Sequence, residues 1–252
     1  MDGMIRLKFT GDIIGLEDGI SILSQELGFE RSEDGIGLFL QRQEGDIRIF
    51  QDNKGISLAF EEDIHFYRAL GLLIEGLRDG RKIDITERPQ FQMNGVMVDV
   101  SRNAVMKPEV IKAILRKMAI MGLNTMMLYA EDTYEVPDRP YFGYMRGRYT
   151  FEELKDCDDY ASKLGIEMIP CIQTLAHLTQ ALRWEAMKDL CDTEDILLVE
   201  NHETYLFIEE MIRAASAPFR SKRIHIGMDE AHMLGLGRYL RLNGFKPGFE
   251  LM

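Results

Sequence analysis

The chain has 252 residues, 46% of them hydrophobic and 29% charged, so it is long enough to bury the core of one large or two modest domains, and wholesale disorder is excluded. Acidic residues outnumber basic ones by 42 to 30. The resulting formal charge of −12 disfavours nonspecific binding to nucleic acid or to an anionic membrane.

Residues 4 to 88 have the pattern of a small α+β unit. Hydrophobic periodicity predicts strands over 5–9, 36–40, 46–50 and 55–60, and amphipathic helices over 14–29 and 64–77. The turns at 44–45 and 52–55 suit hairpins between the last three strands. One sheet covered by helices makes a two-layer unit, and because it holds no catalytic constellation we expect it to act as packing support.

The polar stretch 81–90, which contains Pro89, predicts a domain boundary, with an α+β domain at 1–88 and a second domain at 89–252. In the second domain the sequence predicts strands over 95–100, 124–129, 166–172 and 224–227, and helices over 107–121, 151–164, 203–215 and 233–242. Buried strands that alternate with helices predict an α/β fold with a parallel sheet and right-handed crossovers. No strand is followed by Gly-x-Gly-x-x-Gly, which disfavours a dinucleotide fold.

Polar residues gather where the four predicted strands end. They are Arg102 after the first strand, Glu131 and Asp132 after the second, His177 after the third, and Asp229 with Glu230 after the fourth. Each has an ordinary explanation on its own, as a surface charge, a turn residue or a loop histidine. Their recurrence at equivalent positions favours the catalytic face of a (β/α)8 barrel, where the carboxyl ends of the strands carry the active site.

Two alternatives compete for Asp229 and Glu230. Acidic residues before a helix are common caps, because they suit its unpaired N–H groups and its dipole. A metal site made of His225, Asp229, Glu230 and His232 is a second alternative, but no helical His-Glu-x-x-His spacing is present. The buried strand and Gly227 that precede the acids favour catalysis, and neither a metal nor another cofactor is expected.

The three cysteines are Cys157, Cys171 and Cys191. Their odd number and long spacings predict buried thiols instead of a disulfide framework or a zinc site. Near the start of the chain there is no long apolar segment, so neither a signal peptide nor a membrane span is predicted. These features favour a reducing compartment, and a cytoplasmic location is the expectation.

The residues at the predicted strand ends resemble glycoside hydrolase family 20, the exo-acting β-N-acetylhexosaminidases, and most closely its bacterial N-acetylglucosaminidase branch. The family motif His-x-Gly-x-Asp-Glu is similar to residues 225–230, and its sugar-binding arginine corresponds to Arg102. The acidic pair of its second strand corresponds to Glu131 and Asp132, and the histidine of its third strand to His177. A small α+β domain often precedes the barrel of this family, as residues 4–88 do here.

This resemblance implies removal of a terminal β-linked N-acetylglucosamine or N-acetylgalactosamine from an oligosaccharide or glycoconjugate, by substrate-assisted retaining catalysis. Glu230 is then the general acid and base, and Asp229 is the anion that orients the acetamido group and stabilises the oxazolinium ion. The resemblance further implies that His177 and Asp132 form a relay that orients Glu230, and that Arg102 binds sugar hydroxyls. Which of Glu131 and Asp132 pairs with His177 is left open.

A complete (β/α)8 barrel has eight strands in about 250 residues, whereas four strands are predicted after residue 89. We therefore expect the N-terminal half of a catalytic barrel, in a fragment of a longer enzyme or a truncated gene product. Half-barrels paired in a homodimer are a third possibility. The alternative function is an inactive remnant that binds sugar weakly or self-associates.

Overall fold

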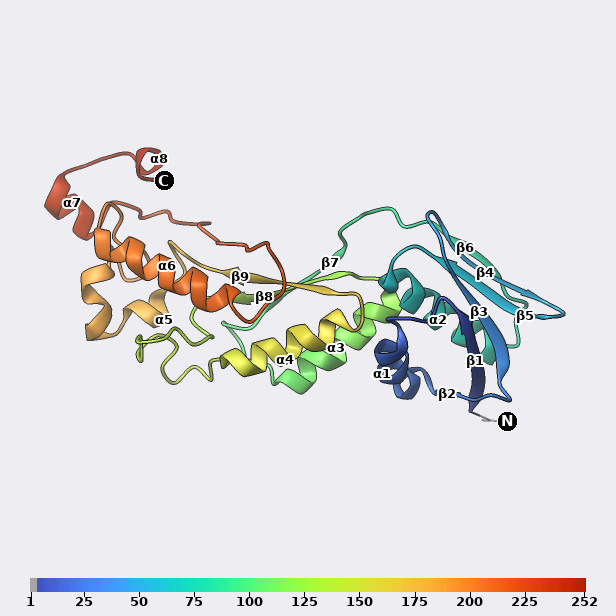
Figure 1. Cartoon of the computed structure of the whole chain (residues 1–252). Helices are drawn as coiled ribbons and strands as arrows, with labels where there is room; N and C mark the ends of the chain where they lie inside the picture. The colour runs from blue at the N-terminus through green and yellow to red at the C-terminus, as the bar shows by residue number, and fades with distance from the viewer. Residues whose placement is uncertain (1–3) are drawn as a thin grey trace. The chain divides into compact units, whose positions relative to one another are not determined.

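A computed structural model of the chain describes residues 4–252 (Figure 1). Its elements are β1 (Ile5–Gly11), α1 (Glu17–Leu27), β2 (Phe29–Arg31), β3 (Ile36–Arg42), β4 (Ile47–Asp52), β5 (Gly55–Phe60), α2 (Asp63–Arg78), β6 (Asp84–Glu87), β7 (Gly95–Asp99), α3 (Pro108–Met121), β8 (Thr125–Ala130), α4 (Phe151–Ser162), β9 (Glu167–Ile172), α5 (Thr179–Leu182), the 3-10 helix η1 (Glu185–Leu190), α6 (His202–Ser216), α7 (Arg238–Asn243) and α8 (Gly248–Leu251). None of the helices in this part of the chain has the length and apolar character needed to cross a membrane.

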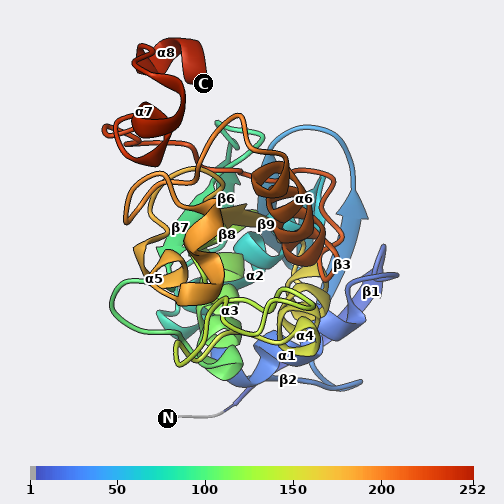
Figure 2. The ribbon, with the colours of Figure 1, turned by 90° about the vertical axis from the view of Figure 1, so that its left-hand side faces the viewer.

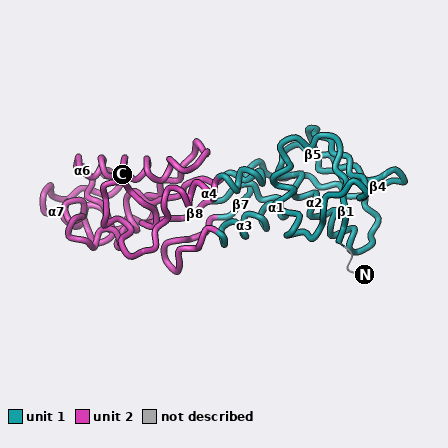
Figure 3. The backbone as a smooth tube through the Cα atoms, turned by 60° about the horizontal axis from the view of Figure 1, so that its bottom comes forward, with its two compact units in different colours: residues 1–96, 109–126, 159–167 teal, residues 97–108, 127–158, 168–252 magenta. Residues whose placement is uncertain are grey.

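The chain divides into two compact units (Figure 3). Unit 1 comprises residues 1–96, 109–126 and 159–167, and unit 2 comprises residues 97–108, 127–158 and 168–252. These compact units are discontinuous in the sequence, so they do not test a domain boundary between residues 88 and 89. That boundary stays a prediction. Residues 1–3 of the predicted first domain lie outside the described residues.

The sheet of unit 1 has six strands in the order β2-β1-β3-β5-β4-β6. β1 pairs in parallel with β2 and β3, and β3 pairs in parallel with β5, whereas β4 is antiparallel to β5 and β6. The hairpin predicted at 52–55 is therefore confirmed. The hairpin predicted at 44–45 is wrong, because β5 inserts between β3 and β4 and the turn has to cross over it.

Helices α1 and α2 lie on the same face of this sheet (Figure 1). α1 ends at Gly28, whose left-handed backbone (φ 60°) lets the cap N–H reach the carbonyls of the last turn. α2 buries a wide face that includes Phe66, Tyr67 and Leu70, and its Tyr67 hydroxyl donates to the carbonyl of Lys163 at 2.8 Å. The predicted two-layer unit is thus present, with β2 and β6 as strands that were too short to predict.

Unit 2 contains most of each strand in a second sheet, whose order is β7-β8-β9. Helices α3 and α4 join these strands, so the predicted strand–helix alternation is confirmed for the first three strands. The small α5 lies between β9 and η1 in the chain, and α7 and α8 form its C-terminal end (Figure 2).

The strand predicted over 224–227 is reduced to one parallel bridge between Cys171 and His225. The bridge is held by the His225 N–H to the Pro170 carbonyl at 2.9 Å and by the Ile172 N–H to the His225 carbonyl at 2.8 Å. Pairing stops there because Gly227 and Met228 have positive φ angles of 73° and 83°, which take the backbone out of the extended region.

The helix predicted over 233–242 is present only as α7, which begins at Arg238. The segment before it is anchored by the buried Asp192, whose carboxylate accepts the N–H groups of Gly235 and Tyr239, each at 2.7 Å. A cluster that includes Leu175, Leu198 and Tyr239 packs beside these contacts. The loop that carries Asp229 and Glu230 is thus tied down on its C-terminal side by buried side chains of unit 2.

Candidate active site

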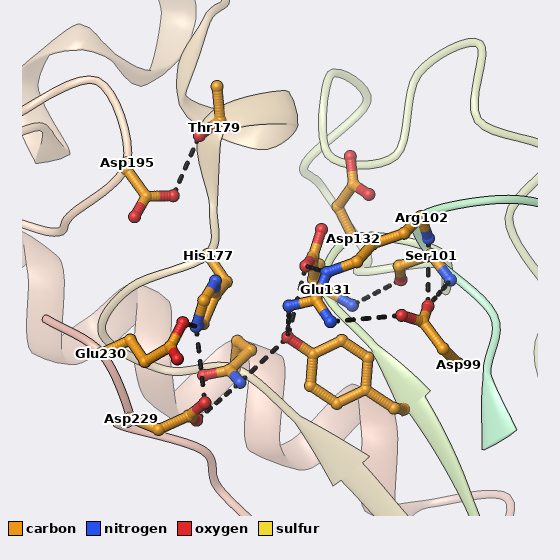
Figure 4. A network of polar contacts seen from close by, with 12 residues as sticks. Asp99, Ser101, Arg102, Glu131, Asp132, His177, Thr179, Asp195, Asp229 and Glu230 are labelled. Atoms are coloured by element: carbon orange, nitrogen blue, oxygen red, sulfur yellow. Dashed lines mark hydrogen bonds and ion pairs between the residues drawn. The ribbon is translucent and has the colours of Figure 1, made fainter. Parts of the chain in front are cut away.

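The five predicted site residues Arg102, Asp132, His177, Asp229 and Glu230 belong to unit 2, and Figure 4 shows them together with Glu131. Asp229 and Glu230 do not cap a helix, since α7 starts well after them, and the capping alternative is therefore wrong. The two acids lie in a loop, with 56% and 67% of their side chains exposed. Exposed acids next to a buried network are suited to meet a ligand.

Arg102 is held at the end of β7 by contacts to three neighbours. Its Nη1 lies 3.3 Å from Oδ2 of Asp99, its Nε lies 3.2 Å from Oε1 of Glu131, and its Nη2 donates to the Tyr129 hydroxyl at 3.0 Å. The guanidinium also covers the Tyr129 ring, with Cζ 4.8 Å from the ring centroid. Half of the side chain stays exposed, so its orientation is fixed while donors remain for a ligand.

Asp132 lies directly after β8 and is 1% exposed. Nε of Arg146 donates to its Oδ1 at 3.1 Å, and its Oδ2 has no hydrogen-bond partner within residues 4–252. Burial raises the pKa of the Asp132 carboxyl, and the charge of Arg146 opposes this shift. The structure therefore brings Asp132 to Arg146 and not to His177, and the relay predicted for Asp132 has no direct contact in the described part of the chain.

Glu131 belongs to the other side of the network. Its Oε1 accepts a hydrogen bond from the Tyr129 hydroxyl at 3.2 Å, and its backbone N–H donates to Oγ of Ser101 at 2.7 Å. Burial raises the pKa of the Glu131 carboxyl, while the charges of Arg102 and His177 lower it. Glu131 therefore faces Tyr129 and Arg102, on the side of the network away from Arg146.

His177 lies next to both acids of the motif, as Figure 4 shows. Its Nε2 is 3.4 Å from Oδ2 of Asp229 and 3.5 Å from Oε2 of Glu230. These separations are long for hydrogen bonds, and Nε2 is a buried nitrogen without a hydrogen-bond partner among the described residues. The imidazole thus lies within 3.5 Å of both carboxyls.

Gln173, directly after β9, is a member of this network that sequence analysis did not select. Its side-chain Nε2 donates to Oδ1 of Asp229 at 2.8 Å and to the Tyr129 hydroxyl at 3.1 Å, and its Oε1 accepts the Met228 N–H at 3.3 Å. The residue is fully buried. A polar side chain that ends a buried apolar strand, four positions before His177, was the available signal.

Gly227 is required by the approach of this glutamine. A Cβ at residue 227 would lie 2.1 Å from Oε1 of Gln173 and 2.7 Å from the Ile172 carbonyl oxygen, and the φ of +73° is unfavourable for other residues. Its N–H donates to Nδ1 of His225 at 3.2 Å, so this ring nitrogen accepts a bond within the motif. The glycine of the motif therefore sets the turn that delivers Asp229.

The groups near the motif that remain are possible metal ligands and a thiol. Within residues 4–252 no group of three or more His, Cys, Asp or Glu side chains is arranged to hold a metal ion. Cys171 is buried beside the motif, and burial raises the pKa of its thiol to about 11, so the thiol stays protonated at neutral pH. No disulfide joins the three cysteines in the described part of the chain.

Comparison with solved structures supports the fold. A GH20 exo β-N-acetylglucosaminidase from Vibrio harveyi, solved in complex with N-acetylglucosamine, superposes on 100% of this chain and 48% of its own, with a TM-score of 0.77 and 18% identity. A chitobiase from Flavobacterium johnsoniae gives a TM-score of 0.77 over 98% of this chain and 46% of its own, also at 18% identity. The predicted α/β fold class, with part of a TIM-barrel-like repeat, is confirmed.

Similar sequences are β-hexosaminidases of several kingdoms. Beta-hexosaminidase 3 of Arabidopsis thaliana is 29% identical over 161 residues, which cover 59% of this chain and 29% of that protein. A beta-hexosaminidase of Vibrio furnissii is 26% identical over 231 residues, covering 74% of this chain and 38% of that protein. Human hexosaminidase D is 28% identical over 159 residues, covering 60% and 32%.

The chain therefore spans less than half of the length of these relatives and about half of the solved structures. The model of the glycosyl hydrolase family 20 catalytic domain matches residues 91–236, a range that holds Arg102, Glu131, Asp132, His177, Asp229 and Glu230. This match covers more than half of the chain and every residue of the network in Figure 4. The chain belongs to glycosyl hydrolase family 20.

Proposed function

We propose that the chain carries the catalytic acids of an exo-acting β-N-acetylhexosaminidase that uses the acetamido group of its own substrate as the nucleophile. The observation that carries this proposal is that two neighbouring acids, Asp229 and Glu230, both lie within 3.5 Å of His177 Nε2. The substrate class is an oligosaccharide or glycoconjugate with a terminal N-acetylglucosamine or N-acetylgalactosamine.

Glu230 is the acid and base in this proposal. Its carboxyl proton passes to the glycosidic oxygen as the bond from that oxygen to C1 breaks, and the acetamido oxygen forms a bond to C1 to give an oxazolinium ion. A water molecule then adds to C1 as the bond from the acetamido oxygen to C1 breaks, one proton of the water passes to Glu230, and the two inversions leave the configuration retained. The exposure of Glu230 and its approach to His177 fit a group that exchanges protons with a ligand.

Asp229 has the opposite task, because it must stay an anion beside the cation that develops on the substrate. The hydrogen bond donated by Gln173 lowers the pKa of the Asp229 carboxyl, and the charge of His177 acts in the same direction. An ionised Asp229 can accept the acetamido N–H and stabilise the oxazolinium ion. The two adjacent acids thus differ in what surrounds them, as a division of roles requires.

Arg102 is proposed to bind hydroxyl groups of the terminal sugar. Its contacts to Asp99, Glu131 and Tyr129 fix the plane of the guanidinium, and a pre-oriented donor loses less entropy when it binds a hydroxyl. Asp132 keeps the role of a positioning acid, acting through Arg146 and the loop that carries it. His177 would orient the Glu230 carboxyl.

The test compares two chromogenic substrates, a β-N-acetylglucosaminide and the β-glucoside that lacks the acetamido group, with the full protein that the gene encodes. The proposal expects turnover of the first substrate only, because the second lacks the internal nucleophile. Turnover of both at similar rates would contradict substrate assistance, and turnover of neither would leave a sugar-binding protein without catalysis. For the 252-residue chain alone we expect little or no turnover.

A further inference from the structure

We propose that Gln173 is a positioning residue that fixes the Asp229 carboxylate in one orientation and keeps it an anion. This inference rests on the proposed function only for its catalytic meaning, since the structural claim concerns two side chains of the chain itself. It assigns a role to a residue outside the acids and the histidine of the motif, and it predicts which of the two adjacent acids is held without a proton.

The orientation of the Gln173 amide follows from its partners. The Met228 N–H can only donate, so the side-chain atom that faces it at 3.3 Å must be the carbonyl Oε1. The NH2 group is then directed to the other side, where it reaches Oδ1 of Asp229 at 2.8 Å and the Tyr129 hydroxyl at 3.1 Å. The direction of each of the three hydrogen bonds made by the buried Gln173 side chain is therefore assigned.

The Tyr129 hydroxyl fixes the remaining directions in the network. It faces the Nη2 of Arg102, which can only donate, and the NH2 of Gln173, which also donates. Burial raises the pKa of this phenol, so it keeps its proton, and among its partners in residues 4–252 the acceptor for that proton is Oε1 of Glu131 at 3.2 Å. The Tyr129 hydroxyl therefore accepts a hydrogen bond from Gln173 Nε2, which is a second reason why the amide is not flipped.

A fixed N–H donor has one consequence for Asp229. A hydrogen bond donated to a carboxylate stabilises the charged form, whereas a protonated Oδ1 would bring two donors face to face. Glu230, the next residue, has no such donor from Gln173, and its contact within the network is with His177. The buried amide therefore distinguishes the two acids.

The choice of residue at position 173 matters for the same reason. Glutamate would fill the same space but would place a second carboxylate against Asp229 and remove the donor to Tyr129. Methionine would fill the space without any donor. Gly227 leaves room for the Gln173 Oε1, so the amide and the glycine together set the position of residues 228 and 229.

The experiment is a carboxyl carbon NMR titration of the 252-residue chain, in which Asp229→Asn identifies the Asp229 signal. In Gln173→Met the pKa of Asp229 should rise relative to wild type, and in Gln173→Glu it should also rise, because a like charge replaces the donor. Gln25→Met, a change at an exposed glutamine of α1 in unit 1, should leave it unchanged. The pKa of Glu26, which is lowered by hydrogen bonds from Lys117 and Arg116, reports that unit 1 of each variant is folded, and the fluorescence of Trp184 reports the same for unit 2.

An Asp229 pKa that is the same in wild type, Gln173→Met and Gln173→Glu would overturn the inference. If Gln173→Met fails to fold, Gln173→Glu still decides, since it retains the size and polarity of the native side chain. The titration needs no turnover, so its failure is distinct from failure of the proposed function, which is measured with the chromogenic substrates.

Discussion

Arg146 and Asp132 form an ion pair whose acid is almost completely buried. The Nε of Arg146 lies 3.1 Å from Oδ1, with 1% of the aspartate side chain and 21% of the arginine side chain exposed. Nη2 of Arg146 also donates to the carbonyl of Ser101, which is buried beside Asp132. The arginine thus joins its own loop to the chain that follows β7 and to the acid that follows β8.

Replacing Arg146 by methionine should destabilise unit 2 by roughly 3 kcal/mol at pH 7, because it leaves a buried carboxylate without its partner. Urea denaturation followed by the fluorescence of Trp184, which is the only tryptophan of the chain and belongs to unit 2, measures this loss. The matched control is Arg213→Met, which removes an exposed pair with Glu209 and should cost less than about 1 kcal/mol.

The cost of this change should depend on pH. Burial raises the pKa of Asp132 in the folded chain, and removal of Arg146 raises it further. For a folded pKa above the unfolded one, stability is fully present below the unfolded pKa and is lost as the pH rises through the folded pKa. The deficit of Arg146→Met should therefore shrink as the pH falls toward 3.8, and a deficit that grows in acid would contradict this account.

Gly227→Ala should be more harmful than an alanine at a glycine where only the backbone angles oppose a side chain. Gly244 has a φ of +81° and a ψ of −177°, with nothing within 4 Å of its added Cβ, so Gly244→Ala measures backbone strain alone, roughly 1–3 kcal/mol. At residue 227 the strain of a positive φ is joined by the collision with Gln173 and Ile172. Equal losses of unfolding free energy in the two variants would show that the collision is relieved at no cost.

Arg102→Leu should weaken the binding of the terminal sugar while leaving the two acids of the motif in place. A hydrogen bond to a charged donor contributes about 1.5–3 kcal/mol, so KM for a β-N-acetylglucosaminide should rise roughly 10- to 100-fold in the full protein. The control is Arg241→Leu, at an exposed position of α7. An unchanged KM in Arg102→Leu would contradict the proposal that Arg102 binds the terminal sugar.

Much of the fold followed from periodicity. The strand–helix alternation from residue 95 to residue 172 is recovered because buried strands and amphipathic helices have distinct apolar spacings. The site residues Arg102, His177, Asp229 and Glu230 were selected because they follow predicted strands, and the structure brings them into one network (Figure 4). The shortened strand at His225 still pairs with Cys171, and this pairing places residues 225–230 next to the end of β9.

What the sequence did not predict depends on contacts between distant segments. The insertion of β5 between β3 and β4 is a choice of strand partners, which alternation of apolar residues does not encode. The pairing of Asp132 with Arg146 depends on how the loop 133–149 folds back, so the sequence left open which of Glu131 and Asp132 faces His177. Gln173 has no titratable group, so only its position in space identifies it.

The central claim is that Glu230 supplies the proton for glycosidic cleavage, and the most direct measurement is kcat/KM of the full protein for a chromogenic β-N-acetylglucosaminide in Glu230→Gln. This change keeps the size of the side chain and removes its exchangeable carboxyl proton. The account predicts a loss of at least ~100-fold, with no loss for Glu250→Gln at an exposed position. A Glu230→Gln enzyme that works at the wild-type rate would contradict it.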